Sequence, residues 1–145
     1  MKYILIICDK TEYWIEIDSY SIAVRQLIFE EGCVEMSCKT DCLAEGVIKA
    51  EDISGTVEYV TADSFETKWE DSLQKYLCEW QIQKEEFPIG KAVVASIKYF
   101  YPQGAILQVG TAQGVCSYKS SMRIGDTVKG KVVSYDDKNL WINVL

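Results

Sequence analysis

The chain has 145 residues, of which 48% are hydrophobic and 26% are charged, and this composition excludes wholesale disorder and a collagen-like repeat. Its early apolar run, Tyr3 to Cys8, is too short to span a membrane, so we expect no membrane association and a cytoplasmic location. Histidine is absent, which removes the commonest general base and the commonest transition-metal ligand.

The net charge of −7 is divided unevenly along the chain. Residues 1–88 carry 8 basic and 19 acidic side chains, a net charge of −11. Residues 89–145 carry 7 basic and 3 acidic side chains, a net charge of +4. Opposite signs indicate two units that have different partners or attract each other. We predict an acidic α+β domain at 1–87 and a basic all-β domain at 88–145.

Six cysteines are present, and three of them, Cys33, Cys38 and Cys42, lie close together in the sequence. With no secretory signal in front of them, free thiols in a reducing compartment are expected. A structural zinc site usually takes four ligands in paired knuckles, and no histidine can complete the set here. We therefore favour small apolar packing residues over a metal site, and expect neither metal nor cofactor.

The sequence of residues 1–60 predicts several short strands. Tyr3–Cys8 and Tyr13–Ile17 predict one hairpin, because a buried apolar run is followed by a turn and an alternating run. Ile22–Phe29 and Cys33–Cys38 predict a second strand pair, and Thr56–Val60 a fifth strand.

The pattern then changes to that of one long helix from Asp63 to Glu86, a stretch without glycine or proline. Thr61, Asp63 or Ser64 can cap it, Glu66 is placed to reach back to Asp63, and Pro88 ends it. We expect its apolar stripe to pack on the preceding sheet rather than to form an exposed partner groove. The stripe consists of Phe65, Trp69, Leu73, Tyr76, Leu77 and Trp80.

After Pro88 the sequence is typical of an all-β unit, with short strands and glycines at the corners. Such a pattern predicts a small closed barrel of five strands. The strands are expected at Lys91–Tyr101, Ala105–Val109, Val115–Tyr118, Thr127–Tyr135 and Leu140–Leu145.

Two segments of this unit carry a family pattern: GKAVVASIKYFYPQGAILQVG at 90–110 and GDTVKGKVVSYDDKNLWINVL at 125–145. Together with Gly114–Ser117 they make residues 90–145 resemble the ribosomal S-one type RNA-binding domain. The resemblance implies a five-stranded OB-fold barrel that binds single-stranded RNA. Where RNA-binding members commonly carry two aromatics and a histidine, this sequence has Gln103, Ile106 and Ser117.

Lysines and tyrosines in the predicted barrel suggest how RNA is held. Single-stranded nucleic acid is typically bound by a basic groove with aromatic stacking platforms. In a strand, Tyr99 and Tyr101 share one face, and Lys98 and Phe100 the other. Alternatively, Phe100 is core and the tyrosines are half-buried barrel residues. The candidate binding residues are Lys91, Lys98, Tyr99, Tyr101, Gln103, Tyr118, Lys119, Arg123 and Lys131.

No phosphate-binding loop, dinucleotide fingerprint, nucleophile elbow or zinc-protease motif is present, so we do not expect an enzyme. The sequence predicts weak binding of single-stranded RNA by the C-terminal barrel, with the acidic domain docking on an assembly or tuning affinity. The alternative is a protein-binding or inhibitory module, for example an immunity-type protein. In that case the acidic domain engages a basic protein partner and the barrel serves as a scaffold.

Overall fold

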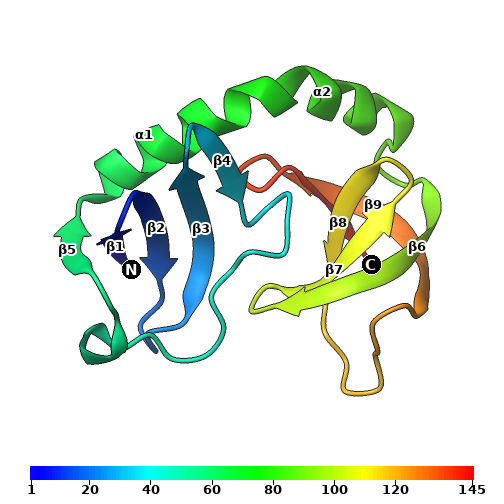
Figure 1. Ribbon diagram of the computed structural model, residues 1–145. Helices are drawn as coiled ribbons and strands as arrows, with labels where there is room; N and C mark the ends of the chain where they lie inside the picture. The colour runs from blue at the N-terminus through cyan, green and yellow to red at the C-terminus, as the bar shows by residue number, and fades with distance from the viewer. The chain divides into compact units, whose positions relative to one another are not determined.

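The computed structural model describes residues 1–145, and the chain divides into two compact units, Met1–Gln74 and Lys75–Leu145 (Figure 1). We describe each unit by itself. The sequence of an α+β unit and then a closed five-stranded barrel agrees with the order of architectures predicted from the sequence. The division falls earlier than the predicted boundary between residues 87 and 88, because the last part of the helical segment packs on the barrel.

Unit 1 is built on an antiparallel five-stranded sheet with strand order β4-β3-β2-β1-β5. The two predicted hairpins and the fifth strand all form. The sheet buries apolar side chains on both faces, as shown by Leu5 and Trp14 on one and Ile4 and Ile15 on the other. The strands are β1 (Lys2–Cys8), β2 (Thr11–Ile17), β3 (Ala23–Glu30), β4 (Cys33–Met36) and β5 (Thr56–Val60).

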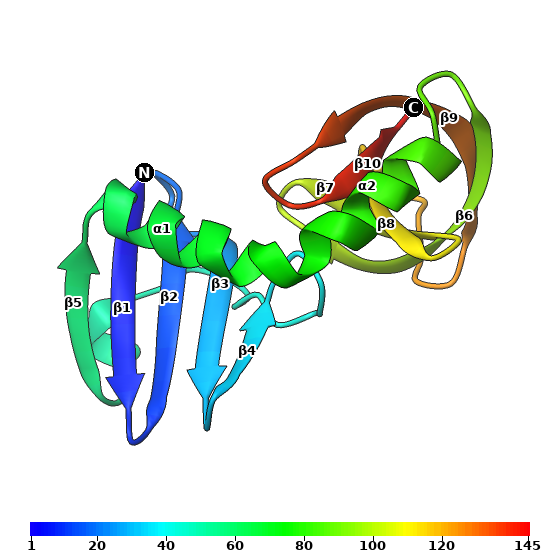
Figure 2. The same cartoon turned by 90° about the horizontal axis from the view of Figure 1, so that it is seen from above.

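Helix α1 (Ala62–Leu73) lies across one face of this sheet (Figure 2). It buries Phe65, Trp69 and Leu73, the first half of the predicted apolar stripe. Thr61 caps the helix, as expected, by accepting a hydrogen bond from the Ser64 amide at 3.1 Å. The predicted capping role of Glu66 is wrong, because its carboxylate instead reaches the sheet.

A buried ion cluster ties α1 to the sheet. The Arg25 guanidinium donates to Glu16 at 2.8 and 3.1 Å, and also to both carboxylate oxygens of Glu66. Its carbon lies 4.9 Å from the ring centres of Phe65 and Trp69. Burial lowers the pKa of Arg25, but the two carboxylates outweigh burial and hold it above its ordinary value. This cation therefore stays charged and connects β2, β3 and α1.

The other face of the sheet is covered by the segment 37–55, which runs between β4 and β5 and contains the short helix η1 (Ala50–Asp52). Leu43 is buried, and the Ala44 amide donates to Gln26 Oε1 at 2.8 Å. Since Gln26 is itself buried in β3, this bond satisfies a polar group that would otherwise be costly in the core.

The long helix predicted from Asp63 to Glu86 is interrupted. A turn of 3-10 helix, η2 (Gln74–Tyr76), separates α1 from α2 (Leu77–Glu86). Tyr76 is half-buried and Leu77 exposed, so the predicted stripe is not continuous. Trp80, expected to pack on the preceding sheet, instead belongs to unit 2. The stripe thus serves two cores, one on each side of η2.

Unit 2 is a closed barrel with strand order β10-β8-β7-β6-β9. Neighbouring strands are antiparallel, except that β10 and β8 run parallel. The third strand begins and ends earlier than predicted, which leaves Tyr118 outside it. The strands are β6 (Ala92–Tyr101), β7 (Gly104–Val109), β8 (Ala112–Cys116), β9 (Thr127–Asp136) and β10 (Trp141–Val144).

Helix α2 is fastened to the barrel by side chains that reach its turns. Trp80 packs edge-on against Tyr135, with ring centres 5.9 Å apart, and donates to Asp137 Oδ1 at 2.8 Å. Gln83 Nε2 donates to the Thr111 carbonyl at 3.0 Å, and the Tyr135 hydroxyl donates to the Phe87 carbonyl at 2.7 Å. These contacts explain why α2 belongs to unit 2.

Substituting Gly114 with alanine is expected to destabilise unit 2 by about 1–3 kcal/mol, because the close parallel pairing of β8 and β10 leaves no room for a side chain. A Cβ atom at this position would lie 2.7 Å from the Ile142 carbonyl oxygen. Chemical denaturation measures the loss, with the exposed Ser120→Ala as control. Equal midpoints for the two variants would contradict this prediction.

Candidate nucleic-acid interface

The outer face of β6 and β9 presents three exposed lysines, Lys98, Lys129 and Lys131. Lys129 lies opposite Val94 and Lys131 opposite Ala92, and both of these β6 residues are also exposed. The lysines point outward because the side chains that alternate with them fill the barrel. These inward residues are Val93, Ala95, Ile97, Val128 and Val132.

The acidic side chains of unit 2 lie outside strands β6, β7 and β8. Unit 2 carries 9 basic and 6 acidic side chains, and none of the acidic ones lies between Pro88 and Gly125. Asp137, in the β9–β10 turn, pairs with Lys84 of α2 at 3.2 Å. The pKa of Asp137 is lowered, first by the Trp80 hydrogen bond and then by Lys84. Strands β6, β7 and β8 therefore carry no carboxylate.

Lys91, one of the predicted binding residues, is exposed but engaged at the end of α2. Its Nζ donates to the Glu86 carbonyl at 2.9 Å and lies 5.1 Å from the centre of the Phe87 ring. The Lys91 amine thus stabilises the C-terminal end of α2. We therefore do not include Lys91 in the candidate interface.

Tyr99 and Tyr101 are only 8% and 9% exposed, so the structure does not present them as the open stacking platforms predicted from the sequence. Their rings lie 4.9 Å apart, and the Tyr101 ring lies 6.3 Å from that of Trp141. Their burial continues the alternation along β6, in which Val93, Ala95 and Ile97 are also buried, and a register shift with β7 lies between Ile97 and Tyr99.

Tyr118 is the predicted aromatic residue that remains open, with 57% of its surface exposed. It is the second residue after β8, and its ring packs edge-on against that of the half-buried Phe100, with ring centres 5.2 Å apart. Lys119 and Arg123 are exposed in the same connection, residues 117–126, and Gln103 is exposed in the β6–β7 turn. The structure thus brings Tyr118 and Lys119 together in the chain beside a supporting aromatic ring.

Lys129 was missed from the sequence, although the alternation of Val128, Gly130 and Val132 could have placed it outside with Lys131. The same region holds an open pocket of about 130 Å³ at one end of the barrel, which we call the end pocket. Burial raises the pKa of the Cys116 thiol, and Lys119 opposes that effect. The end pocket is lined by Cys116, Ser117, Lys119, Met122, Val128, Lys129, Val144 and Leu145.

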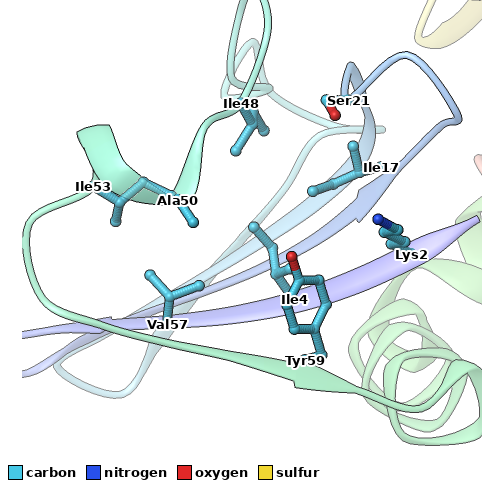
Figure 3. A pocket seen from close by; sticks show the side chains of 9 residues that line it. All are labelled: Lys2, Ile4, Ile17, Ser21, Ile48, Ala50, Ile53, Val57 and Tyr59. Atoms are coloured by element: carbon cyan, nitrogen blue, oxygen red, sulfur yellow. The ribbon is translucent and has the colours of Figure 1, made fainter.

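Unit 1 has a smaller pocket of about 50 Å³ between its sheet and the segment 37–55 (Figure 3). In Figure 3, Ile48, Ala50 and Ile53 of this segment face Ile4 and Val57 of the sheet. An apolar cavity that accepts benzene measures about 150 Å³, so this space fits a packing gap better than a binding site. The lining is completed by Lys2, Ile17, Ser21 and Tyr59.

The three clustered cysteines differ in their surroundings: Cys33 is exposed, Cys42 half-buried and Cys38 buried. No group of three or more cysteine, aspartate or glutamate side chains is arranged to hold a metal ion. No helix combines the length and apolar character needed to cross a bilayer. Comparison with protein-family models and with curated proteins gives no match to the chain, so its function is inferred from the geometry described above.

Proposed function

We propose that unit 2 is an OB-fold barrel that binds single-stranded RNA. Strands β6, β7 and β8 follow one another as neighbours, and β9 returns to lie beside β6, which is a Greek-key arrangement. The fifth strand, β10, then joins β8 to β9 and closes the barrel. The OB fold is a five-stranded Greek-key barrel used for oligonucleotide binding, so this topology supports the resemblance of residues 90–145 to the S-one type domain.

The observation that carries the proposal is the basic face made by Lys98, Lys129 and Lys131, which are all exposed. Phosphate contacts supply most of the affinity in sequence-independent binding, and an exposed lysine forms them without first breaking an ion pair. Val94 lies opposite Lys129 on the same face, and Asp136, the acidic residue of these two strands, lies at the end of β9 that pairs with β10.

Tyr118 supplies the stacking platform of the proposed interface. Its ring is exposed and is held edge-on by Phe100, which limits its rotation. A base stacked on an aromatic side chain contributes about 1–3 kcal/mol, and stacking tolerates any sequence. Lys119, the next residue, can contact the phosphate backbone of the RNA whose base stacks on Tyr118.

Fluorescence anisotropy with a labelled mixed-sequence RNA tests this proposal. Replacing Lys98, Lys129 and Lys131 together with alanine is expected to weaken binding at least about tenfold at low salt. The slope of log K against log salt should fall in magnitude by about 2, since each lost contact to a single strand removes about 0.7. Replacing Lys10, Lys49 and Lys75 is the control, because these exposed lysines lie outside the barrel strands.

If the full chain binds no RNA at 50 mM salt, or if both triple variants lose the same affinity, the basic face is not the interface. The first result would remove the RNA proposal altogether. The second would mean that only the total charge of the chain matters.

A second candidate function rests on the charge of unit 1, which carries 6 basic and 16 acidic side chains. Glu16 and Glu66 are engaged by Arg25, whereas most of the other carboxylates are exposed, among them Glu30, Glu31 and Glu35 around the β3–β4 turn. This surface suits a basic protein partner, and in the RNA proposal it serves for docking or regulation. Salt-sensitive capture of a basic partner by a chain that binds no RNA would favour the protein-binding function.

A further inference from the structure

We propose that the end pocket receives one single-ring nucleobase of the bound strand, with the neighbouring phosphates on Lys119 and Lys129. This inference rests on the proposed RNA-binding function and adds to it a preference for pyrimidines. It concerns the pocket between the connection 117–126 and the ends of β9 and β10, which shares Lys129 with the basic face of β6 and β9.

The size of the end pocket sets the preference. Its volume is about 130 Å³, close to the roughly 150 Å³ of an apolar protein cavity that accepts benzene. A pyrimidine ring has nearly the dimensions of benzene, so it fits such a space. The two fused rings of a purine are larger than a benzene-sized space, so we expect part of a purine to stay outside the pocket.

The walls of the end pocket match the two surfaces of a nucleotide. Met122, Val128 and Val144 form an apolar lining for the faces of the ring. Methionine suits this role, because its flexible thioether makes favourable contacts with aromatic rings. Lys119 and Lys129 are exposed members of the lining, and it contains no Asp or Glu side chain. The exposed lysines of the end pocket therefore complement phosphate, and its apolar lining complements a base.

Polar groups for the edge of the base are also present in the lining. The Ser117 hydroxyl can donate and accept hydrogen bonds. Cys116 is half-buried, and burial raises the pKa of its thiol, so it remains a neutral, weak donor at pH 7. A neutral wall adds no charge that would repel a phosphate.

Anisotropy with labelled oligo(U), oligo(C) and oligo(A) of equal length tests the preference. We expect the two pyrimidine strands to bind about five- to tenfold more tightly than oligo(A). Met122→Trp fills the pocket and should remove this difference. Ile124→Trp is the matched control, because Ile124 is exposed in the same connection and does not line the pocket. Met122→Ala should widen the pocket and strengthen binding of oligo(A), which keeps the test informative if the tryptophan variant does not fold.

A titration with uridine or adenosine monophosphate, followed by amide NMR, separates failure of the inference from failure of the proposed function. Shifts at Ser117, Lys119 and Met122 with the uridine nucleotide, and not with the adenosine nucleotide, support the inference even if no oligonucleotide binds. Equal binding of the three oligonucleotides, unchanged in Met122→Trp, overturns the inference and leaves the RNA proposal standing. Absence of binding by both the oligonucleotides and the nucleotides overturns both.

Discussion

Replacing Arg25 with methionine is expected to lower the free energy of unfolding of unit 1 by about 3–5 kcal/mol. Arg25 is 4% exposed and is bonded to the carboxylates of both Glu16 and Glu66. Methionine keeps much of the side-chain volume but leaves two negative groups close together in a low-dielectric site. Lysine at this position should restore only part of the loss, because one ammonium cannot make paired bonds to two carboxylates.

Hydrogen exchange followed by mass spectrometry measures the loss of stability in each unit separately. Protection should fall in β2, β3 and α1, whereas the barrel strands keep theirs. Lys10→Met is the matched control, since Lys10 is exposed in the β1–β2 turn. A variant at Arg25 with the same protection as this control would show that the cluster contributes nothing net to stability.

Replacing Trp80 with alanine is expected to destabilise unit 2 by about 3–5 kcal/mol, the usual range when a buried aromatic is truncated. Trp80 is 3% exposed, and its loss removes both the contact with Tyr135 and the hydrogen bond to Asp137. The same reasoning predicts that a fragment starting at Lys75 is more stable than one starting at Pro88, because the shorter one lacks Trp80 and Gln83.

Thermal unfolding and hydrogen exchange measure both effects. Ile82→Ala is the control on the same helix, because Ile82 is exposed and makes no barrel contact of this kind. Equal unfolding temperatures for the two fragments would show that the barrel does not need α2. That result would return the domain boundary to residue 87, where the sequence places it.

The strands could be predicted because each carries its own short-range signal. The runs at Tyr3–Cys8 and Thr56–Val60 alternate or are continuously apolar, and the turns between strands are polar or contain glycine. The apolar stripe of the helical segment does not indicate which strands it packs against. Trp69 and Trp80 both follow the helical periodicity of apolar residues, yet they pack in different units. Periodicity predicts which face of a helix is apolar, but it does not predict which element packs against that face.

The candidate interface was predictable where it depends on alternation and not where it depends on tertiary structure. Lys98 and Lys131 lie outside because their strand neighbours lie inside. The burial of Tyr99 and Tyr101 follows the same alternation and agrees with the alternative that they are barrel residues, whereas the contact of Tyr101 with Trp141 depends on tertiary structure. The end pocket could not be predicted from the sequence either. Its lining residues come from β8, the connection after it, β9 and β10, which only the folded barrel brings together.

The position of β10 in the barrel has a consequence for synthesis of the protein. Residues 1–73 contain every strand of the first sheet and the helix that covers it, so unit 1 can fold while the rest of the chain is still being made. The barrel cannot close until Trp141–Val144 have left the ribosome, because β10 alone joins β8 to β9. During that interval the nascent β8 and β9 expose unpaired edges, and chaperones that shield such edges have their opportunity to act on this chain.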